Sequence, residues 1–114
     1  MKFILLIHGD EQELARRDPA LTKSIVEGHM RFAADLRGAG KMVASERLRP
    51  EAEATRIRLK NGHVQVTDGP FAETKEVLGG FYLIECASKV EALEWARKLP
   101  LEGIRVEVRP VWEM

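Results

Sequence analysis

The chain of 114 residues has a single cysteine, Cys86, and no net charge, because its 18 basic residues balance its 18 acidic ones. One cysteine excludes an internal disulfide framework and is typical of the reducing cytoplasm. Zero net charge creates no field that would attract nucleic acid or an anionic membrane, so we expect direct binding to neither. The N-terminal apolar run, residues 3–7, is too short for a signal peptide or a membrane span. The sequence therefore predicts a cytoplasmic protein.

Motifs for the common cofactors are also missing. The chain contains no phosphate loop, dinucleotide fingerprint, zinc-protease motif or nucleophile elbow. His8 and Asp10 are close together, but two ligands without a third do not form a metal site. We therefore predict no cofactor and no metal. A single domain spanning residues 1–114 can bury about 65% of its unfolded surface without disulfides or metals.

Apolar periodicity and turn residues predict four core strands, two helices and a hairpin. The first helix begins at Asp18-Pro19, because Asp18 can cap free amides and Pro19 suits the first helical position. The second begins at a capping box formed by Ser88 and Glu91. The expected core strands are residues 3–8, 42–48, 81–86 and 104–112, and the helices end near Gly38–Gly40 and before Pro100.

The dipeptide Asn61-Gly62 predicts a hairpin with a two-residue turn. This turn fixes the register, so that Ile57 pairs with Val66 and Leu59 pairs with Val64 on one face of the ribbon. The hairpin is therefore expected to have one apolar face and one polar face.

Without the hairpin, the element order is the ferredoxin-like split βαβ arrangement, an α+β fold with two helices on one face of an antiparallel sheet. The strands at residues 3–8 and 81–86 are apolar on both faces, and such strands need cover on both sides. Two helices cover only one side. The inserted hairpin or a second subunit must cover the other, and we expect a homodimer.

Residues 68–85, DGPFAETKEVLGGFYLIE, are the most informative segment of the chain. Asp68-Gly69-Pro70 has turn chemistry, and Gly79-Gly80 is expected to release the chain into the strand at residues 81–86. This segment resembles the signature of the DGPF branch of the YCII-related family. The N-terminal strand, the hairpin turn and the last strand agree, so the resemblance covers essentially the whole chain. It implies a dimeric α/β barrel in which two sheets face each other.

His29 is the first candidate site residue, because it lies mid-helix on the apolar stripe. The resemblance implies a catalytic His/Asp pair, with a helix histidine about a dozen residues before a glycine, and His29 and Gly40 keep that spacing. Asp68, Asp35 and Asp10 could each supply the carboxylate. Asp35 is six residues from His29 on the same helix, which is a poor angle for contact. We therefore favour Asp68.

A carboxylate that accepts a hydrogen bond from one ring nitrogen of His29 would leave the other nitrogen as a general base. It would also raise the pKa of the ring, because a nearby anion favours the imidazolium. The simpler interpretation is a half-buried helix histidine that is satisfied by a backbone carbonyl and has no catalytic role.

The loop that opens the signature is the second candidate site. It offers carboxylates, a hydroxyl and an ammonium group, and its glycines permit close approach of the backbone to a ligand. An equally strong interpretation is structural, with Asp68 capping its own turn and Phe71 filling the core. The predicted ligand-binding residues are Asp68, Gly69, Glu73, Thr74 and Lys75.

Two functions compete, and a purely structural dimer that needs no site is a third interpretation. The first is a small-molecule pocket between sheet and helices, with acid–base catalysis by His29 and Asp68. The second is a non-enzymatic regulatory or interaction module, because the family includes members that are fused to, or encoded beside, sigma factors of the extracytoplasmic-function type. Such a module would act on transcription through a protein partner. The sequence specifies neither a substrate nor a reaction.

Overall fold

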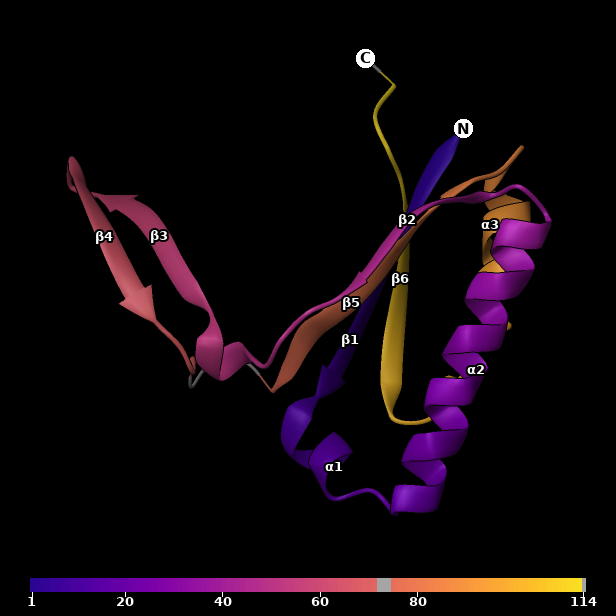
Figure 1. The fold of residues 1–114 in the computed structure, drawn as a ribbon. Coiled ribbons are helices and arrows are strands. Elements are labelled where there is room, and N and C mark those ends of the chain that lie inside the picture. The colour runs from indigo at the N-terminus through magenta and orange to yellow at the C-terminus, as the bar shows by residue number, and fades with distance from the viewer. Residues whose placement is uncertain (72–74, 114) are drawn as a thin grey trace.

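The computed structural model describes residues 1–71 and 75–113, so Glu73 and Thr74 of the predicted site lie outside the described residues. The elements follow the order strand, two helices, strand, hairpin, strand, helix, strand (Figure 1). They are β1 (Lys2–Asp10), α1 (Glu11–Ala15), α2 (Pro19–Gly38), β2 (Met42–Arg47), the 3-10 helix η1 (Glu51–Glu53), β3 (Thr55–Lys60), β4 (His63–Asp68), β5 (Glu76–Glu85), α3 (Lys89–Ala96) and β6 (Ile104–Pro110).

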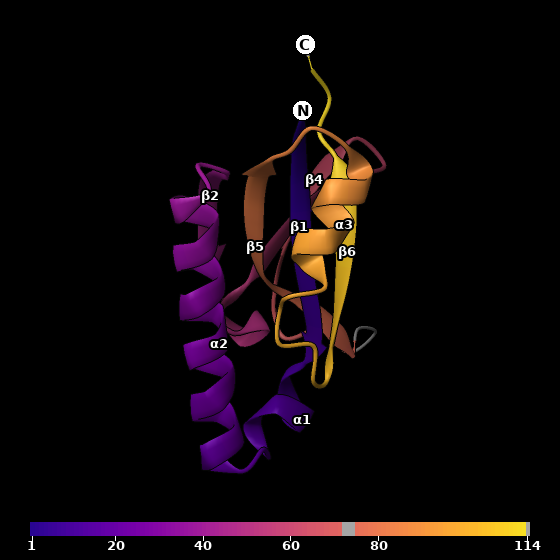
Figure 2. The same cartoon turned by 90° about the vertical axis from the view of Figure 1, so that its right-hand side faces the viewer.

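The central sheet has the strand order β2-β5-β1-β6, and every pair of neighbours is antiparallel. Helices α2 and α3 lie on the same face of this sheet (Figure 2). This arrangement is the ferredoxin-like α+β fold that the sequence predicts.

Capping explains where the two long helices begin. The Asp18 carboxylate accepts a 2.9 Å hydrogen bond from the backbone N–H of Ala20, and Pro19 occupies the first turn of α2. The Ser88 hydroxyl accepts from the N–H of Glu91 at 3.3 Å at the start of α3. Both predicted helix starts are confirmed.

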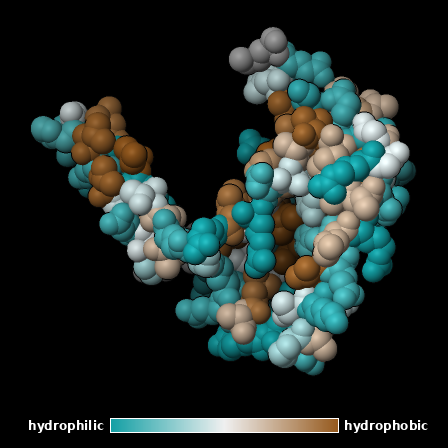
Figure 3. All heavy atoms as spheres, viewed as in Figure 1, coloured by the Kyte–Doolittle hydropathy of each residue, from teal (hydrophilic) through white to brown (hydrophobic). Residues whose placement is uncertain are grey.

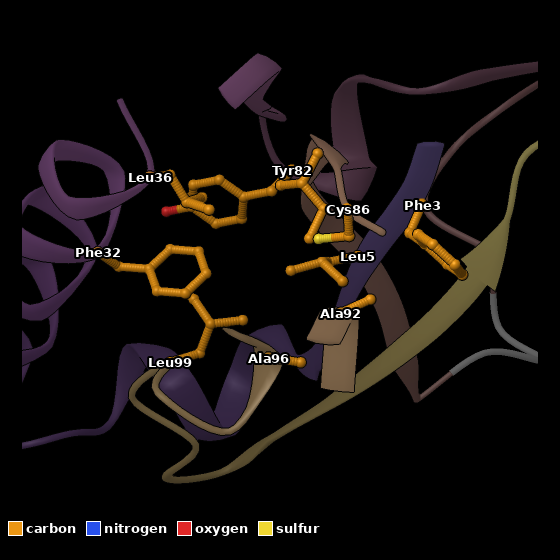
Figure 4. Close-up of a cluster of buried hydrophobic side chains, with 10 residues drawn as sticks. Phe3, Leu5, Phe32, Leu36, Tyr82, Cys86, Ala92, Ala96 and Leu99 are labelled. Atoms are coloured by element: carbon orange, nitrogen blue, oxygen red, sulfur yellow. The ribbon is translucent and has the colours of Figure 1, made fainter. Parts of the chain in front are cut away.

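The hydrophobic core lies between the sheet and these helices. Phe3 and Leu5 of β1 and Leu36 of α2 are almost completely buried. Figure 4 shows the Tyr82 ring extending from the sheet towards Leu36 and the neighbouring Phe32. The buried cluster consists of Phe3, Leu5, Phe32, Leu36, Tyr82, Ile84, Cys86, Ala92, Ala96 and Leu99.

Two local predictions need correction. Strand β5 begins at Glu76, five residues before the predicted start, and runs through the two glycines that were assigned to a loop. Gly80 is held in the ladder because it pairs with Ile7 of β1, so pairing overrides its low strand propensity. The short helix α1 was not predicted. Its N-cap is Asp10, whose carboxylate accepts hydrogen bonds from two backbone amides of the first turn.

Strands β3 and β4 form a separate two-stranded sheet, which we call the arm (residues 55–68). Asn61 and Gly62 have φ angles of 53° and 77°, which confirms the predicted turn. The predicted register is also confirmed, since Ile57 pairs with Val66 and Leu59 with Val64. The arm projects away from the central sheet on the side opposite the helices (Figures 1 and 2).

The apolar side of the arm is open to solvent. Figure 3 shows hydrophobic residues gathered there, and Ile57, Leu59, Val64 and Val66 are 72%, 72%, 67% and 64% exposed. The arm therefore does not bury these side chains against the central sheet. Its projection also explains a radius of gyration of 16.2 Å, against about 13 Å for a compact domain of this size.

The helix-free side of the central sheet, which we call the open face, is apolar along its middle. Side chains from β1 and β5 lie there, and each is only half-buried because no helix covers it. Since strand pairing puts cross-strand partners on the same side, charged residues of β6 border this strip. The apolar residues of the strip are Ile4, Leu6, Phe81 and Leu83.

Candidate functional site

His29 of α2 faces Tyr82 of β5 and forms a hydrogen bond with it. The Nδ1 atom of His29 and the Oη atom of Tyr82 are 2.8 Å apart. The two rings are nearly parallel, with an interplanar angle of 4° and a centroid separation of 6.0 Å. Phe32, one turn along α2, packs edge-on against Tyr82 at 4.9 Å between centroids and supports its ring.

Tyr82 is a site residue that was not predicted from the sequence. The signal was present, because alternation along residues 81–86 places Tyr82 on the same side as Ile84 and opposite Phe81. In the structure Tyr82 pairs with Leu5, a core residue, and this pairing directs its ring towards α2.

The surroundings of this pair favour neutral side chains. Burial, followed by the positive charge of Arg47, lowers the pKa of His29. Burial raises the pKa of Tyr82, against a smaller lowering effect of Arg37. This direction is opposite to the raised pKa that an adjacent Asp68 carboxylate would give His29. Near neutral pH the structure therefore favours an uncharged imidazole bonded to a protonated phenol.

Arg47 lies on the edge strand β2, on the same side of the sheet as this pair. Ser45 pairs with Tyr82 and Arg47 pairs with Gly80, so both strand positions share the helix-covered side of the sheet with Tyr82. Glu46 alternates to the opposite side, where it pairs with Phe81. Arg47 therefore brings its charge to the side of the sheet on which His29 lies.

Asp68 lies at the base of the arm, where its Oδ1 atom accepts a 3.0 Å hydrogen bond from the hydroxyl of Thr55. The adjacent N–H of Gly69 donates to the carbonyl of Ala54 at 2.7 Å. Within the described residues, His29 and Asp68 thus have different hydrogen-bond partners. A functional contact between them stays a prediction.

Gly69 and Phe71 of the signature loop also contact the base of the arm. A Cβ atom at Gly69 would overlap the carbonyl oxygen of Glu51 in η1. Phe71 is buried, with the guanidinium of Arg56 3.5 Å above its ring. Lys75 is exposed. These contacts favour the structural interpretation of the loop, while its predicted ligand-binding role stays a prediction.

Asp10 and Asp35, the two alternatives to Asp68 as partner of His29, lie in other parts of the structure. Asp10 caps α1. Asp35 lines a hollow of about 250 Å³ between α2 and the turn before β6, together with Arg31 and Lys98. A second hollow of about 350 Å³ lies beside Trp112 near the chain ends. Neither hollow is lined by His29, which lies at the junction of α2 and the sheet.

The described residues form neither a metal site nor a membrane-spanning helix. Residues 1–71 and 75–113 contain no group of three or more His, Cys, Asp or Glu residues that could hold a metal ion. In that same part of the chain, no helix has the length and apolar character needed to cross a membrane. Cys86 is buried in the core, and burial raises the pKa of its thiol, as expected of a small core side chain.

Comparison with known proteins identifies a family that matches the whole chain and a relative that matches part of it. Residues 1–114 match the sequence profile of the YCII-related domain. An uncharacterized protein of Rhizobium meliloti (strain 1021) is 52% identical over 77 residues, which cover 64% of this chain and 61% of that protein. The match therefore spans about three fifths of the relative.

Proposed function

The chain belongs to the YCII-related domain family, and we propose that, as a member of its DGPF branch, it is a cytoplasmic acid–base enzyme for a small molecule bound beside His29. The observation that carries this proposal is the hydrogen bond between His29 and Tyr82 in surroundings that lower the pKa of His29. A half-buried histidine that is neutral near pH 7 is ready to take up a proton.

In this proposal the two side chains have distinct tasks. Tyr82 holds Nδ1, which fixes the orientation of the imidazole ring. Nε2 has no hydrogen-bond partner among the described residues, so it is the nitrogen that can face a ligand. When Nδ1 donates to the phenol, Nε2 has a free lone pair and acts as a general base; in the other tautomer Nε2 carries the proton and acts as an acid.

Asp68 belongs to a competing form of this proposal, in which its carboxylate rather than the phenol of Tyr82 activates His29. The two forms predict opposite pKa shifts for the ring, because a carboxylate stabilises the imidazolium whereas burial and Arg47 destabilise it. A titration of the ring therefore separates them.

We also propose that the protein is a homodimer in which each copy covers the open face and the arm of the other. An isolated two-stranded hairpin is only marginally stable in water, so the arm needs a surface to pack on. Fully burying its four exposed apolar side chains would contribute about 1–2 kcal/mol each. A stable interface needs roughly 800 Å² per partner, and the arm and the open face are the two exposed apolar surfaces that could contribute to it.

The proposed activity is tested by ligand-observed NMR with a library of small molecules. We expect ligands that bind the wild-type protein and bind His29→Gln and Tyr82→Phe more weakly, while Asp35→Asn, at the hollow lined by Arg31 and Lys98, leaves their binding unchanged. Ligands that bind all of these variants equally would contradict a site at His29.

The exposed arm also supports a second proposed function, that of an interaction module which acts through a protein partner. Its exposed apolar face is of the kind that marks protein interaction sites. A pull-down in which the wild-type chain retains a sigma factor and Leu59→Asp does not would support this function. Self-association as the only contact of the arm would contradict it.

A further inference from the structure

Arg47 has no carboxylate partner among the described residues, although it lies beside the His29–Tyr82 pair. Arg49, two residues further along, is bonded to Glu53 at 2.8 Å. Glu46 precedes Arg47 but lies on the opposite side of the sheet. The positive charge of Arg47 is therefore not balanced by its nearest acidic residue in sequence.

The strand register places this charge close to the reacting groups. Arg47 pairs with Gly80, two residues before Tyr82 on β5, and is thus a diagonal neighbour of Tyr82 on the same side of the sheet. Diagonal neighbours in a sheet are about 7–8 Å apart, within reach of a long side chain. The guanidinium can therefore reach a molecule that contacts Nε2 of His29.

Two positive charges act on the pair, and no carboxylate among the described residues contributes to the shifted pKa of either His29 or Tyr82. His29 and Tyr82 are favoured in their neutral forms and add no negative charge. Arg37, near the end of α2, adds a second positive charge on the Tyr82 side. What this site lacks is a negatively charged group.

We propose that the ligand of this site is a small organic carboxylate, held by Arg47 while His29 exchanges a proton with the adjacent part of the molecule. A planar guanidinium binds a carboxylate through two parallel N–H···O bonds, and such charge-assisted bonds are among the strongest in proteins. The proposal rests on the proposed function for the position of the reacting group, but the binding of the anion requires only Arg47.

The test uses the full-length, isotope-labelled protein and three probes: benzoate, its neutral isostere benzamide, and inorganic phosphate. Benzoate should shift the NMR signals of the His29 and Tyr82 rings, and benzamide should bind at least tenfold more weakly. Arg47→Gln should weaken benzoate binding about tenfold, as expected for the loss of a charged hydrogen-bond partner. Arg58→Gln, on the polar side of the arm, is the matched control and should leave benzoate binding unchanged.

Equal binding of benzoate and benzamide, or unchanged benzoate binding by Arg47→Gln, would overturn the proposal. Phosphate that shifts the same signals as strongly as benzoate would overturn the assignment to a carboxylate. His29→Gln separates this inference from the proposed function. It should bind benzoate more weakly than the wild type but keep the preference for benzoate over benzamide, detected at Tyr82, even though it can no longer exchange a proton.

Discussion

The Oη atom of Tyr82 lies 2.8 Å from Nδ1 of His29, so the hydrogen-bond partner of this nitrogen is a phenol. This contact joins α2 to β5, one of the two inner strands of the central sheet. The bond that orients the imidazole therefore also stabilises the packing of α2 on the sheet. The phenol gives His29 a partner without giving it a negative charge.

Removal of the Tyr82 hydroxyl should weaken the protein as well as the site. Tyr82→Phe leaves Nδ1 of His29 without its partner, and we expect the free energy of unfolding to fall by about 1–2 kcal/mol. Urea denaturation of Tyr82→Phe, His29→Gln and the double variant measures the coupling. The double variant should lose clearly less stability than the sum of the losses in the two single variants. A loss equal to that sum would show that the bond contributes nothing.

Gly69 should be essential for the base of the arm. A Cβ at this position overlaps the carbonyl oxygen of Glu51, so Gly69→Ala forces the loop away from η1. We expect a loss of about 2–3 kcal/mol in thermal or urea unfolding, as for other overpacked positions. Gly79→Ala is the control, because its Cβ would lie 3.8 Å from the nearest heavy atom, the carbonyl oxygen of Ile7. Equal stability of the two variants would contradict the structural role of the loop.

The turn at the tip of the arm should not tolerate a β-branched residue. Gly62 has a φ of 77°, and Gly62→Val places a branched side chain in the left-handed region at a cost of about 2 kcal/mol. Hydrogen exchange of the amides in β3 and β4 should accelerate, while exchange in β1 stays slow. Gly38→Ala, where a Cβ meets no neighbouring atom within 4 Å, serves as the control. Unchanged protection of the arm in Gly62→Val would refute the turn assignment.

The dimer predicts a molecular mass by light scattering of about twice the 12.9 kDa of the chain. Leu59→Asp puts a charge on the exposed apolar side of the arm and should give a monomer, because an unpaired charge cannot be buried in an interface. Arg58→Asp changes the opposite side of the arm and should remain dimeric. A wild-type protein that is monomeric at micromolar concentration would contradict the proposed cover of the arm and the open face.

The sequence predicted features that depend on local chemistry. Asp18, Ser88 and the Asn61-Gly62 turn act on neighbouring backbone groups, so their effects are readable without the fold. The early start of β5 was missed because pairing with β1 determines it. The hydrogen bond between His29 and Tyr82 was not predicted. The two residues are 53 positions apart, and the spacing of apolar residues along a helix gives no information about a side chain on a strand.

The pH dependence of stability follows from the same environment of His29. Its pKa in the folded protein is below the ordinary value of about 6.5, so as the pH falls through that value the unfolded chain takes up a proton first. The contribution of His29 to stability is therefore retained above about pH 6.5 and is lost as the pH falls towards its lowered folded pKa. His29→Gln should remove this part of the acid sensitivity.

The most direct test of the account is an NMR titration of the His29 ring in the wild-type protein, in Arg47→Gln and in Asp68→Asn. We predict a wild-type pKa below the ordinary value, a higher pKa in Arg47→Gln because a nearby positive charge is gone, and no change in Asp68→Asn. A wild-type pKa above the ordinary value that falls in Asp68→Asn would contradict the account, and would establish Asp68 rather than Tyr82 as the partner that sets the chemistry of His29.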